Sequence, residues 1–291
     1  MSALLYESHS HTPLCKHAIG TPGEYAEVAS QRGLRGVIIT CHNPIPDGYS
    51  SHVRMDPEEF PQYVDLVQAS AEEWKDKVDI RLGIECDYAP GMESYIEKFL
   101  QSQPFHHVLG SVHPQIPEYR QRYFNGDYFE YQKVYFDHLA LAAETGFFDT
   151  LSHPDLVKNE SPESWDIERI LPFICDALDR IAAEGTAMEL NTSGANKSLP
   201  QMNPAPEILR EMRIRGIPVV LGADAHRPSR VGDGYEIALD LLKDAGFQSV
   251  SFFLNRNRYD IPIADARKSL ISIDSAVQVP HASQTSHASP K

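Results

Sequence analysis

The sequence predicts an α/β fold, arranged as an incomplete or distorted (β/α)7 barrel, from three observations. Short β-forming runs alternate with amphipathic helix patterns along most of the chain, which indicates parallel strands connected by helices. This alternation repeats seven times in succession. The chain also lacks the glycine fingerprint of a dinucleotide-binding open sheet. Repeated units without that fingerprint favour a barrel, whose site is built at the carboxyl ends of the strands.

Each predicted strand is a short run that ends in polar residues. The runs cover residues 4–7, 36–40, 80–84, 107–110, 149–151, 187–190 and 218–222. Proline, aspartate or glycine, which favour helix starts, opens the helix pattern after each run, near Pro22, Pro57, Gly91, Asp127, Asp166, Pro204 and Gly234. The run SVSFFLN around Phe252 is a candidate for a further strand, although no site-like residue follows it.

The length and composition fit one domain over residues 1–274, followed by a polar, flexible tail over residues 275–291. The chain has 291 residues, of which 42% are hydrophobic, enough for a sizeable core. Neither a membrane-spanning run nor a signal peptide is evident, and the four cysteines form no disulfide-like framework. We therefore expect a cytoplasmic location. Cys41 and Cys86 are expected to pack on the strand face opposite the site, the role of Cys15 is open, and the tail histidines His281 and His287 are expected to be bystanders.

The net charge of −15 limits the kinds of partner. Nucleic acid binding needs a basic footprint, so no nucleic acid partner is expected. A small phosphorylated substrate is compatible if metals and a few cations share one cleft. An acidic surface also suits a substrate that carries an amine.

Metal-type side chains recur where the predicted strands end. They are His9, His11, His42, Glu85, His113, His153, Glu189, Asn191, Asp224 and His226. In extended chain, residues two apart point to the same side, so H-x-H and D-x-H each present two side chains to one cavity. Histidine and carboxylate ligands suit zinc, iron or manganese. His52, His106, His107 and His138 do not follow the end of a predicted strand. We expect His106 and His107 to be structural and His138 to lie on the surface or in packing.

The ordered motifs HSH, ITCHNP, GIECDY, GSVH, SHPDLVK and GADAH resemble those of the polymerase-and-histidinol-phosphatase (PHP) superfamily, and most closely its histidinol-phosphate phosphatases. The resemblance spans Tyr6 to His226. It implies a distorted (β/α)7 barrel with three metal ions. By position, His9, His11, Glu85 and Asp224 would hold the first metal, Glu85 would bridge to a second held by His113 and His153, and His17, His42 and His226 would hold the third. Asn191 is then a candidate substrate contact and Glu189 a candidate support behind the ligands.

The resemblance implies hydrolysis of L-histidinol phosphate by a metal-activated hydroxide, with Glu85, Asp224 and His226 as the catalytic residues. Expected phosphate contacts are Lys158 and Arg227, with Arg54 and Arg120 as weaker candidates. The segment 114–127 departs from the family pattern. We expect it to close over the substrate, with Glu118 facing an amine and Tyr119, Tyr123 and Phe124 covering a ring.

Two other functions stay open at this point. A phosphodiesterase, or a phosphatase for another small phosphoester, would use the same metals. A degenerate barrel that acts as a binding or regulatory module is disfavoured, because the ligand set is intact.

Overall fold

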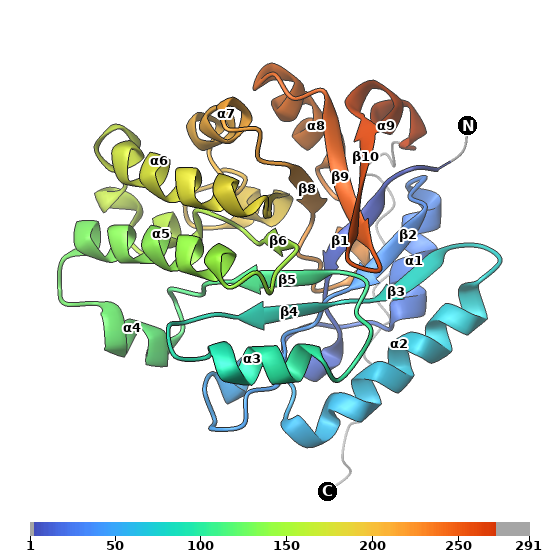
Figure 1. The fold of residues 1–291 in the computed structure, drawn as a ribbon. Coiled ribbons are helices and arrows are strands. Elements are labelled where there is room, and N and C mark those ends of the chain that lie inside the picture. The colour runs from blue at the N-terminus through green and yellow to red at the C-terminus, as the bar shows by residue number, and fades with distance from the viewer. Residues whose placement is uncertain (1–2, 272–291) are drawn as a thin grey trace, which may run out of the picture.

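The computed structural model describes residues 3–271, and the predicted tail lies outside them. Strands occupy the centre and helices surround them (Figure 1), so the predicted α/β class is confirmed. The strands form one sheet of order β1-β2-β3 and another of order β10-β9-β8-β7-β6-β5-β4. Among the described residues, no helix combines the length and apolar character that a membrane crossing requires.

The smaller sheet is parallel and contains β1 (Tyr6–Ser10), β2 (Gly36–Ile39) and β3 (Asp79–Leu82). The larger sheet runs parallel from β4 to β9, and its strands are β4 (Ile84–Asp87), β5 (Val108–Ser111), β6 (Thr150–Leu151), β7 (Ala187–Asn191), β8 (Val219–Gly222), β9 (Ser249–Leu254) and β10 (Asn257–Pro262). Isolated parallel bridges, Ser10 to Ala225 and His42 to Glu85, connect the two sheets at two places. These bridges set the predicted ligand segments side by side.

The predicted third strand is broken in two at Gly83. Before it, β3 pairs with β2; after it, β4 pairs with β5. A Cβ atom at Gly83 would lie 2.8 Å from Ile38 Cγ2 and 2.9 Å from the His107 carbonyl oxygen. Only glycine therefore fits where the chain passes from one sheet to the other. The buried Tyr63 hydroxyl donates to the Gly83 carbonyl at 2.8 Å and closes the gap in the backbone pairing.

The helices begin close to the predicted starts. Their bounds are α1 (Pro22–Gln31), α2 (Phe60–Trp74), α3 (Glu93–Leu100), α4 (Pro117–Tyr123), α5 (Tyr128–Glu144), α6 (Ile167–Glu184), α7 (Pro206–Ile214), α8 (Tyr235–Asp244) and α9 (Ile263–Ser269). Side-chain caps explain three of these starts, because Thr21, Asp127 and Asp166 each accept a backbone N–H of the first turn. The short helices α4 and α9 were not predicted.

A hairpin formed by β9 and β10 completes the larger sheet. The candidate strand around Phe252 is confirmed as β9, whereas β10 was missed because most of its side chains are exposed. The turn residues Asn255 and Arg256 both have positive φ, at 51° and 62°. Arg256 is held there because its guanidinium donates to Asp149 Oδ2 and to the Phe147 carbonyl, each at 2.6 Å.

The break at Gly83 gives the first prediction. Gly83→Ala should lower the free energy of unfolding by about 1–3 kcal/mol, because the added methyl overpacks the junction of the sheets. Urea denaturation measures this difference. Gly146→Asn is the matched control, since Gly146 follows a helix at φ +68° with nothing within 4 Å of a built Cβ and asparagine is accepted at such positions. A Gly83→Ala protein as stable as the control would contradict the tight junction.

Candidate metal centre

The predicted ligands converge on the carboxylate of Glu85, which lies on β4 and is fully buried. Its Oε2 atom is 2.9 Å from His42 Nδ1, 3.4 Å from His9 Nε2 and 3.6 Å from His11 Nε2. Its Oε1 atom is 3.1 Å from His153 Nε2 and 3.7 Å from His113 Nε2. One carboxylate therefore faces imidazoles that come from segments spread over the chain.

Asp224 forms a second point of convergence, just beyond the carboxyl end of β8. Its Oδ1 atom is 3.2 Å from His11 Nε2, 3.4 Å from His226 Nδ1 and 3.6 Å from His9 Nε2. Asp224 and His153 both have positive φ, at 48° and 29°. Non-glycine residues rarely adopt such φ values, and strain of this kind concentrates at functional sites.

The remaining predicted ligand, His17, joins the same cluster. Ligand atoms of His17, His42 and His226 all lie within 4.8 Å of one another, as do those of His9, His11 and Asp224 and those of His11, His42 and Glu85. The rings of His17 and His226 lie 4.5 Å apart between centroids. All of the predicted ligands are thus brought into one cluster.

Several buried polar atoms in this cluster lie close to one another but lack a hydrogen bond of acceptable geometry. They are His9 Nε2, both ring nitrogens of His11, His42 Nδ1, Glu85 Oε2, His153 Nδ1 and His226 Nε2. Leaving such atoms unpaired is costly, whereas a cation among imidazole nitrogens and carboxylate oxygens would give them partners. The donor set therefore fits divalent metal ions.

The electrostatics differ among the ligands. Burial opposes protonation of His9 and His11, but nearby carboxylates raise the pKa of His9 well above its usual value and that of His11 to about 9, whereas other positions favour the deprotonated form. Burial opposes ionisation of Glu85, but the imidazoles of His42 and His9 hold the pKa of this carboxyl well below its usual range. Burial lowers the pKa of His42 to about 4 and that of His226 to about 2. Neutral imidazoles keep the lone pair that a metal needs.

Carboxylates and carbonyls behind the cluster orient three of the rings. Glu189 Oε1 lies 2.8 Å from His9 Nδ1, Asp87 Oδ1 lies 2.8 Å from His113 Nδ1, and the Cys15 carbonyl lies 2.6 Å from His17 Nδ1. Such contacts fix the tautomer and turn Nε2 inward. The expected supporting place of Glu189 is thus confirmed. Asp87 was missed, although its position two residues after Glu85 on one strand was a usable signal.

Arg54 is held in this supporting layer, and its expected contact with phosphate stays a prediction. It is 1% exposed and forms an ion pair with Asp87. It also donates to the Asn43 carbonyl at 2.7 Å and to Ser50 Oγ at 2.6 Å. Burying Asp87 beside His113 requires this compensating cation.

Lys158 also differs from its expected role in phosphate binding. Its ammonium is fully buried and donates to Asp155 Oδ2 and to the Met202 carbonyl, both at 2.9 Å, and to Gln201 Oε1 at 3.3 Å. An ammonium has three N–H groups, so these acceptors use all of them. Lys158 instead ties the 3₁₀ turn Leu156–Asn159 to the segment before α7.

The other expected substrate contacts are divided between internal pairs and the surface. Arg120 donates to Glu160 Oε2 at 2.8 Å and to the Tyr128 hydroxyl at 3.0 Å. Asn191 donates to Glu189 Oε2 at 2.9 Å and accepts from Ser193. Glu118 accepts from the Ser50 backbone N–H at 3.3 Å, and Arg227 is exposed beside His226. Arg120 and Asn191 therefore serve internal contacts.

Lys197 is a site residue that the sequence reasoning missed. Its Nζ atom lies 3.9 Å from Asp224 Oδ2, and its side chain is 30% exposed. It follows the 3₁₀ turn Thr192–Asn196 after β7. Its place in the loop after a ligand-side strand was the available signal.

The segment 114–127 contains α4 and packs its aromatic rings inward. Tyr119 is 1% exposed, and its hydroxyl bonds His138 Nδ1 at 2.7 Å. The rings of Tyr123 and His138 lie 4.5 Å apart, and those of Phe124 and Tyr131 lie 5.3 Å apart. These contacts correct the expectation that the aromatic residues cover a substrate ring, and they assign His138 to packing.

The structural role expected for His107 is confirmed, whereas the expectation that Cys41 packs on the face opposite the site is wrong. His107 is buried, bonds Thr150 Oγ1 at 2.9 Å and stacks on Phe253. Cys41 and Cys86 are buried. Cys41 does not lie apart from the site, because it contacts Thr12 Oγ1 at 3.2 Å beside His11, and a Cys15 ligand atom lies within 4.8 Å of those of His11 and His226.

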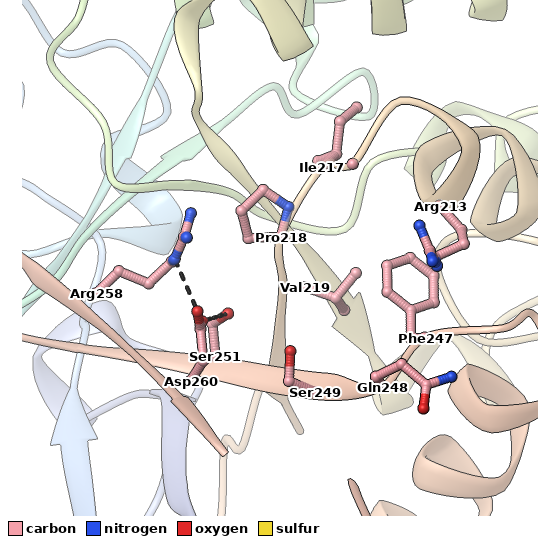
Figure 2. A pocket seen from close by; sticks show the side chains of 11 residues that line it. Arg213, Ile217, Pro218, Val219, Phe247, Gln248, Ser249, Ser251, Arg258 and Asp260 are labelled. Atoms are coloured by element: carbon pink, nitrogen blue, oxygen red, sulfur yellow. Dashed lines mark hydrogen bonds and ion pairs between the residues drawn. The ribbon is translucent and has the colours of Figure 1, made fainter. Parts of the chain in front are cut away.

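Two cavities differ in their relation to the cluster. One of about 140 Å³ is lined by the ligands His17, His42 and His113, together with His52, Val53, Arg54, Gln115 and Ile116. Figure 2 shows another, at the amino end of β8, where Pro218 and Val219 lie between Arg213 and Arg258. None of the candidate ligands lines that second cavity. The first cavity therefore borders the cluster.

Comparisons with known proteins find similar sequences and similar structures. The PHP domain family matches residues 7–193. A Deinococcus radiodurans protein named "Probable histidinol-phosphatase" is 38% identical over 85% of this chain and 96% of its own length. The Bacillus subtilis histidinol-phosphatase is 26% identical over 80% of this chain and 98% of its own length. The structure of a Lactococcus lactis histidinol phosphate phosphatase, complexed with zinc, L-histidinol and phosphate, superposes with a TM-score of 0.71 at 22% identity and covers 89% of this chain and all of its own.

The contact between His138 and Tyr119 gives a pH prediction. Burial lowers the pKa of His138 to about 4, below the value of about 6.5 expected in the unfolded chain. The unfolded state therefore binds more protons between these values, and stability is lost as the pH falls through this window. Between pH 7.5 and 4.5, the wild type should lose about 2–3 kcal/mol more unfolding free energy than His138→Gln.

Urea denaturation at the two pH values measures this loss. Tyr119→Phe is an intermediate case, because it removes the donor that favours the neutral ring but leaves the ring buried. Equal pH dependence in the wild type and in His138→Gln would show that His138 does not titrate as described.

Proposed function

The chain belongs to the PHP domain family, and from this premise we propose that it is a metal-dependent phosphatase that hydrolyses L-histidinol phosphate to L-histidinol and phosphate. The observation that carries the proposal is the convergence of histidines and Asp224 around the buried Glu85. Such a cluster suits phosphoester hydrolysis, because cations held there would offset the charge of the reacting phosphoryl group.

We assign three divalent ions, zinc, iron or manganese, to this cluster. The first is assigned to His9, His11, Glu85 and Asp224, the second to Glu85, His113 and His153, and the third to His17, His42 and His226. The unpartnered buried nitrogens and the Glu85 oxygen support this assignment, as does the close grouping of the ligand atoms. Bound divalent metals would polarise the phosphoryl group and lower the pKa of a bound water.

The same proposal includes the finer architecture. Residues 1–274 would form one domain in which the two sheets close into a distorted (β/α)7 barrel, with the metals at the carboxyl ends of the strands. The bridges Ser10 to Ala225 and His42 to Glu85 support closure. His113, His153 and Asp224 follow the ends of β5, β6 and β8, which supports the placement of the metals.

The phosphate is held by cations of the chain as well as by metals. Lys197 lies 3.9 Å from Asp224 and is 30% exposed, so its ammonium is placed to contact a ligand bound beside Asp224. Arg227 follows His226 at the surface and is a second candidate. Lys158 and Arg54 are committed to buried acids and serve the scaffold instead.

The alcohol end of the substrate occupies the cavity between residues 52–54 and 115–116. Val53 and Ile116 offer an apolar wall, and Glu118, which is bonded to the adjacent Ser50, is placed for a cationic amine. The excess of 41 acidic over 26 basic residues favours approach of such a substrate.

A substrate comparison tests the proposed function. After reconstitution with manganese, iron or zinc, kcat/KM should be higher for L-histidinol phosphate than for nucleoside monophosphates, p-nitrophenyl phosphate and bis-p-nitrophenyl phosphate. The reason is that only histidinol phosphate combines a phosphomonoester with a cationic amine and a small ring. Phosphate release measures each rate.

Two results would contradict this reading in different ways. A preference for the diester by about tenfold or more, equivalent to 1.4 kcal/mol, would make the protein a phosphodiesterase built on the same metals. No preference for histidinol phosphate over p-nitrophenyl phosphate would mean that another small phosphoester is the substrate.

The two lysines give a matched pair of variants. Lys197→Ala should lower kcat/KM by about 10- to 150-fold, because it removes a charge-assisted contact to phosphate worth about 1.5–3 kcal/mol. Lys158→Ala should instead lower the free energy of unfolding by about 3–5 kcal/mol, because it leaves Asp155 buried without its cation.

Steady-state kinetics, metal analysis and urea denaturation on both variants separate these effects. Metal content should stay unchanged in Lys197→Ala. Loss of metal in that variant, or a catalytic defect without destabilisation in Lys158→Ala, would reverse the assignment.

A further inference from the structure

His52 lines the cavity that leads to the metal cluster, although its position in the sequence follows no strand end. The cavity wall combines His52, Val53, Gln115 and Ile116 with the ligands His17, His42 and His113 and the buried Arg54. Two surface loops, one after β2 and one after β5, therefore meet over the ligands. The following inference rests on the proposed phosphatase function.

The 3₁₀ turn Ser51–Val53, which carries His52, is clamped from three sides. Lys16 lies between the cluster residues Cys15 and His17, and its ammonium donates to the Ser51 carbonyl at 2.8 Å and to Asp56 Oδ1 at 3.0 Å. Arg54 donates to Ser50 Oγ at 2.6 Å, and the Ser50 N–H donates to Glu118 at 3.3 Å.

This clamp holds an otherwise exposed turn in one position. Ser50 has a positive φ of 45°, a conformation that costs energy outside glycine and persists when its surroundings impose it. The fixed turn places the exposed imidazole of His52 at the cavity rather than leaving it to move with a free loop.

The other residues of this wall are unsuited to proton transfer. His17, His42 and His113 belong to the ligand set, and Arg54 is committed to Asp87. Val53, Gln115 and Ile116 do not titrate. Among the residues that line this cavity, His52 is thus the one titratable side chain that is neither a ligand nor held in an ion pair.

We propose that His52 is the general acid for the leaving alcohol. Water adds to phosphorus and releases one proton to solvent while the ester P–O bond breaks, and the imidazolium of His52 transfers its proton to the departing oxygen. The alcohol leaves neutral, and the neutral imidazole regains a proton from solvent. Histidine suits this role because it can donate and recover a proton near neutral pH. An alkoxide leaves poorly without such a proton, whereas a nitrophenolate leaves readily without one.

The test compares leaving groups in His52→Gln, which keeps a polar side chain of similar reach. Its kcat on L-histidinol phosphate should fall by about 100- to 10,000-fold, the usual contribution of a positioned acid. Its kcat on p-nitrophenyl phosphate should stay close to that of the wild type. Metal content should be unchanged, because His52 is not a ligand.

Control variants distinguish a role of His52 as a proton donor from a role in shaping the cavity. Gln115→Ala changes the same cavity and should affect both substrates alike. His106→Gln replaces a histidine that lies beside the β9–β10 turn, far from the proposed chemistry, and should leave both rates unchanged. Lys16→Met loosens the clamp, so it should show a smaller loss with the same dependence on the leaving group.

The outcomes distinguish this proposal from the proposed function. Equal loss on both substrates, no loss on either, or loss of metal in His52→Gln would overturn the role of His52 as an acid. If the wild type hydrolyses p-nitrophenyl phosphate but not L-histidinol phosphate, the substrate assignment fails, and β-glycerol phosphate then supplies the alkyl leaving group for the same comparison. A wild type inactive on all three would overturn both proposals.

Discussion

The buried carboxylate of Glu85 is the constraint on which the site depends. It lies on β4, where the bridge to His42 joins the two sheets, and it is fully removed from solvent. An unpaired charge at such a place costs several kcal/mol. The chain compensates by bringing imidazoles from β1, from the loop after β2 and from the ends of β5 and β6 around it. The arrangement of the strands therefore also provides the polar partners that the buried Glu85 carboxylate needs.

A layer of further buried acids holds this arrangement in place. Glu7 accepts backbone N–H groups of His9, Ala223 and Gly232 at 2.7–3.1 Å and so ties β1 to the segment after β8. Burial raises the pKa of Glu7 to about 7 in spite of these donors. Glu189 orients His9 and accepts the His153 N–H at 2.8 Å. The strained backbone at His153 and Asp224 persists because such contacts fix it from several directions.

The sequence was most informative where the signal is local. Strand ends, helix caps and the two-residue spacing of HSH and GADAH follow from backbone geometry, so the ligand cluster and most helix starts were predictable. The phosphate contacts were not predictable, because residues distant in the sequence decide which acid or carbonyl a lysine or arginine contacts. Lys158 meets Met202 and Gln201, more than 40 residues away in the chain, and Arg54 meets Asp87. The break at Gly83 could not be predicted either, because a single β-forming run in the sequence contributes one strand to each of the two sheets.

Two of the side-chain cations near the cluster are already paired with buried acids. Arg54 and Lys158 are neutralised by Asp87 and Asp155, while Glu85, Asp224 and Glu189 remain acidic groups facing or supporting the cavity side. Lys197 offers one charge, and its nearest acid is already Asp224. Against the effect of burial, the neighbouring carboxylates raise the pKa values of His9 and His11, so metal ions bound here would replace protons on these rings. Such ions would also add positive charge for a dianionic ester. Metal binding and phosphate binding would then be linked through the same carboxylates, Glu85 and Asp224.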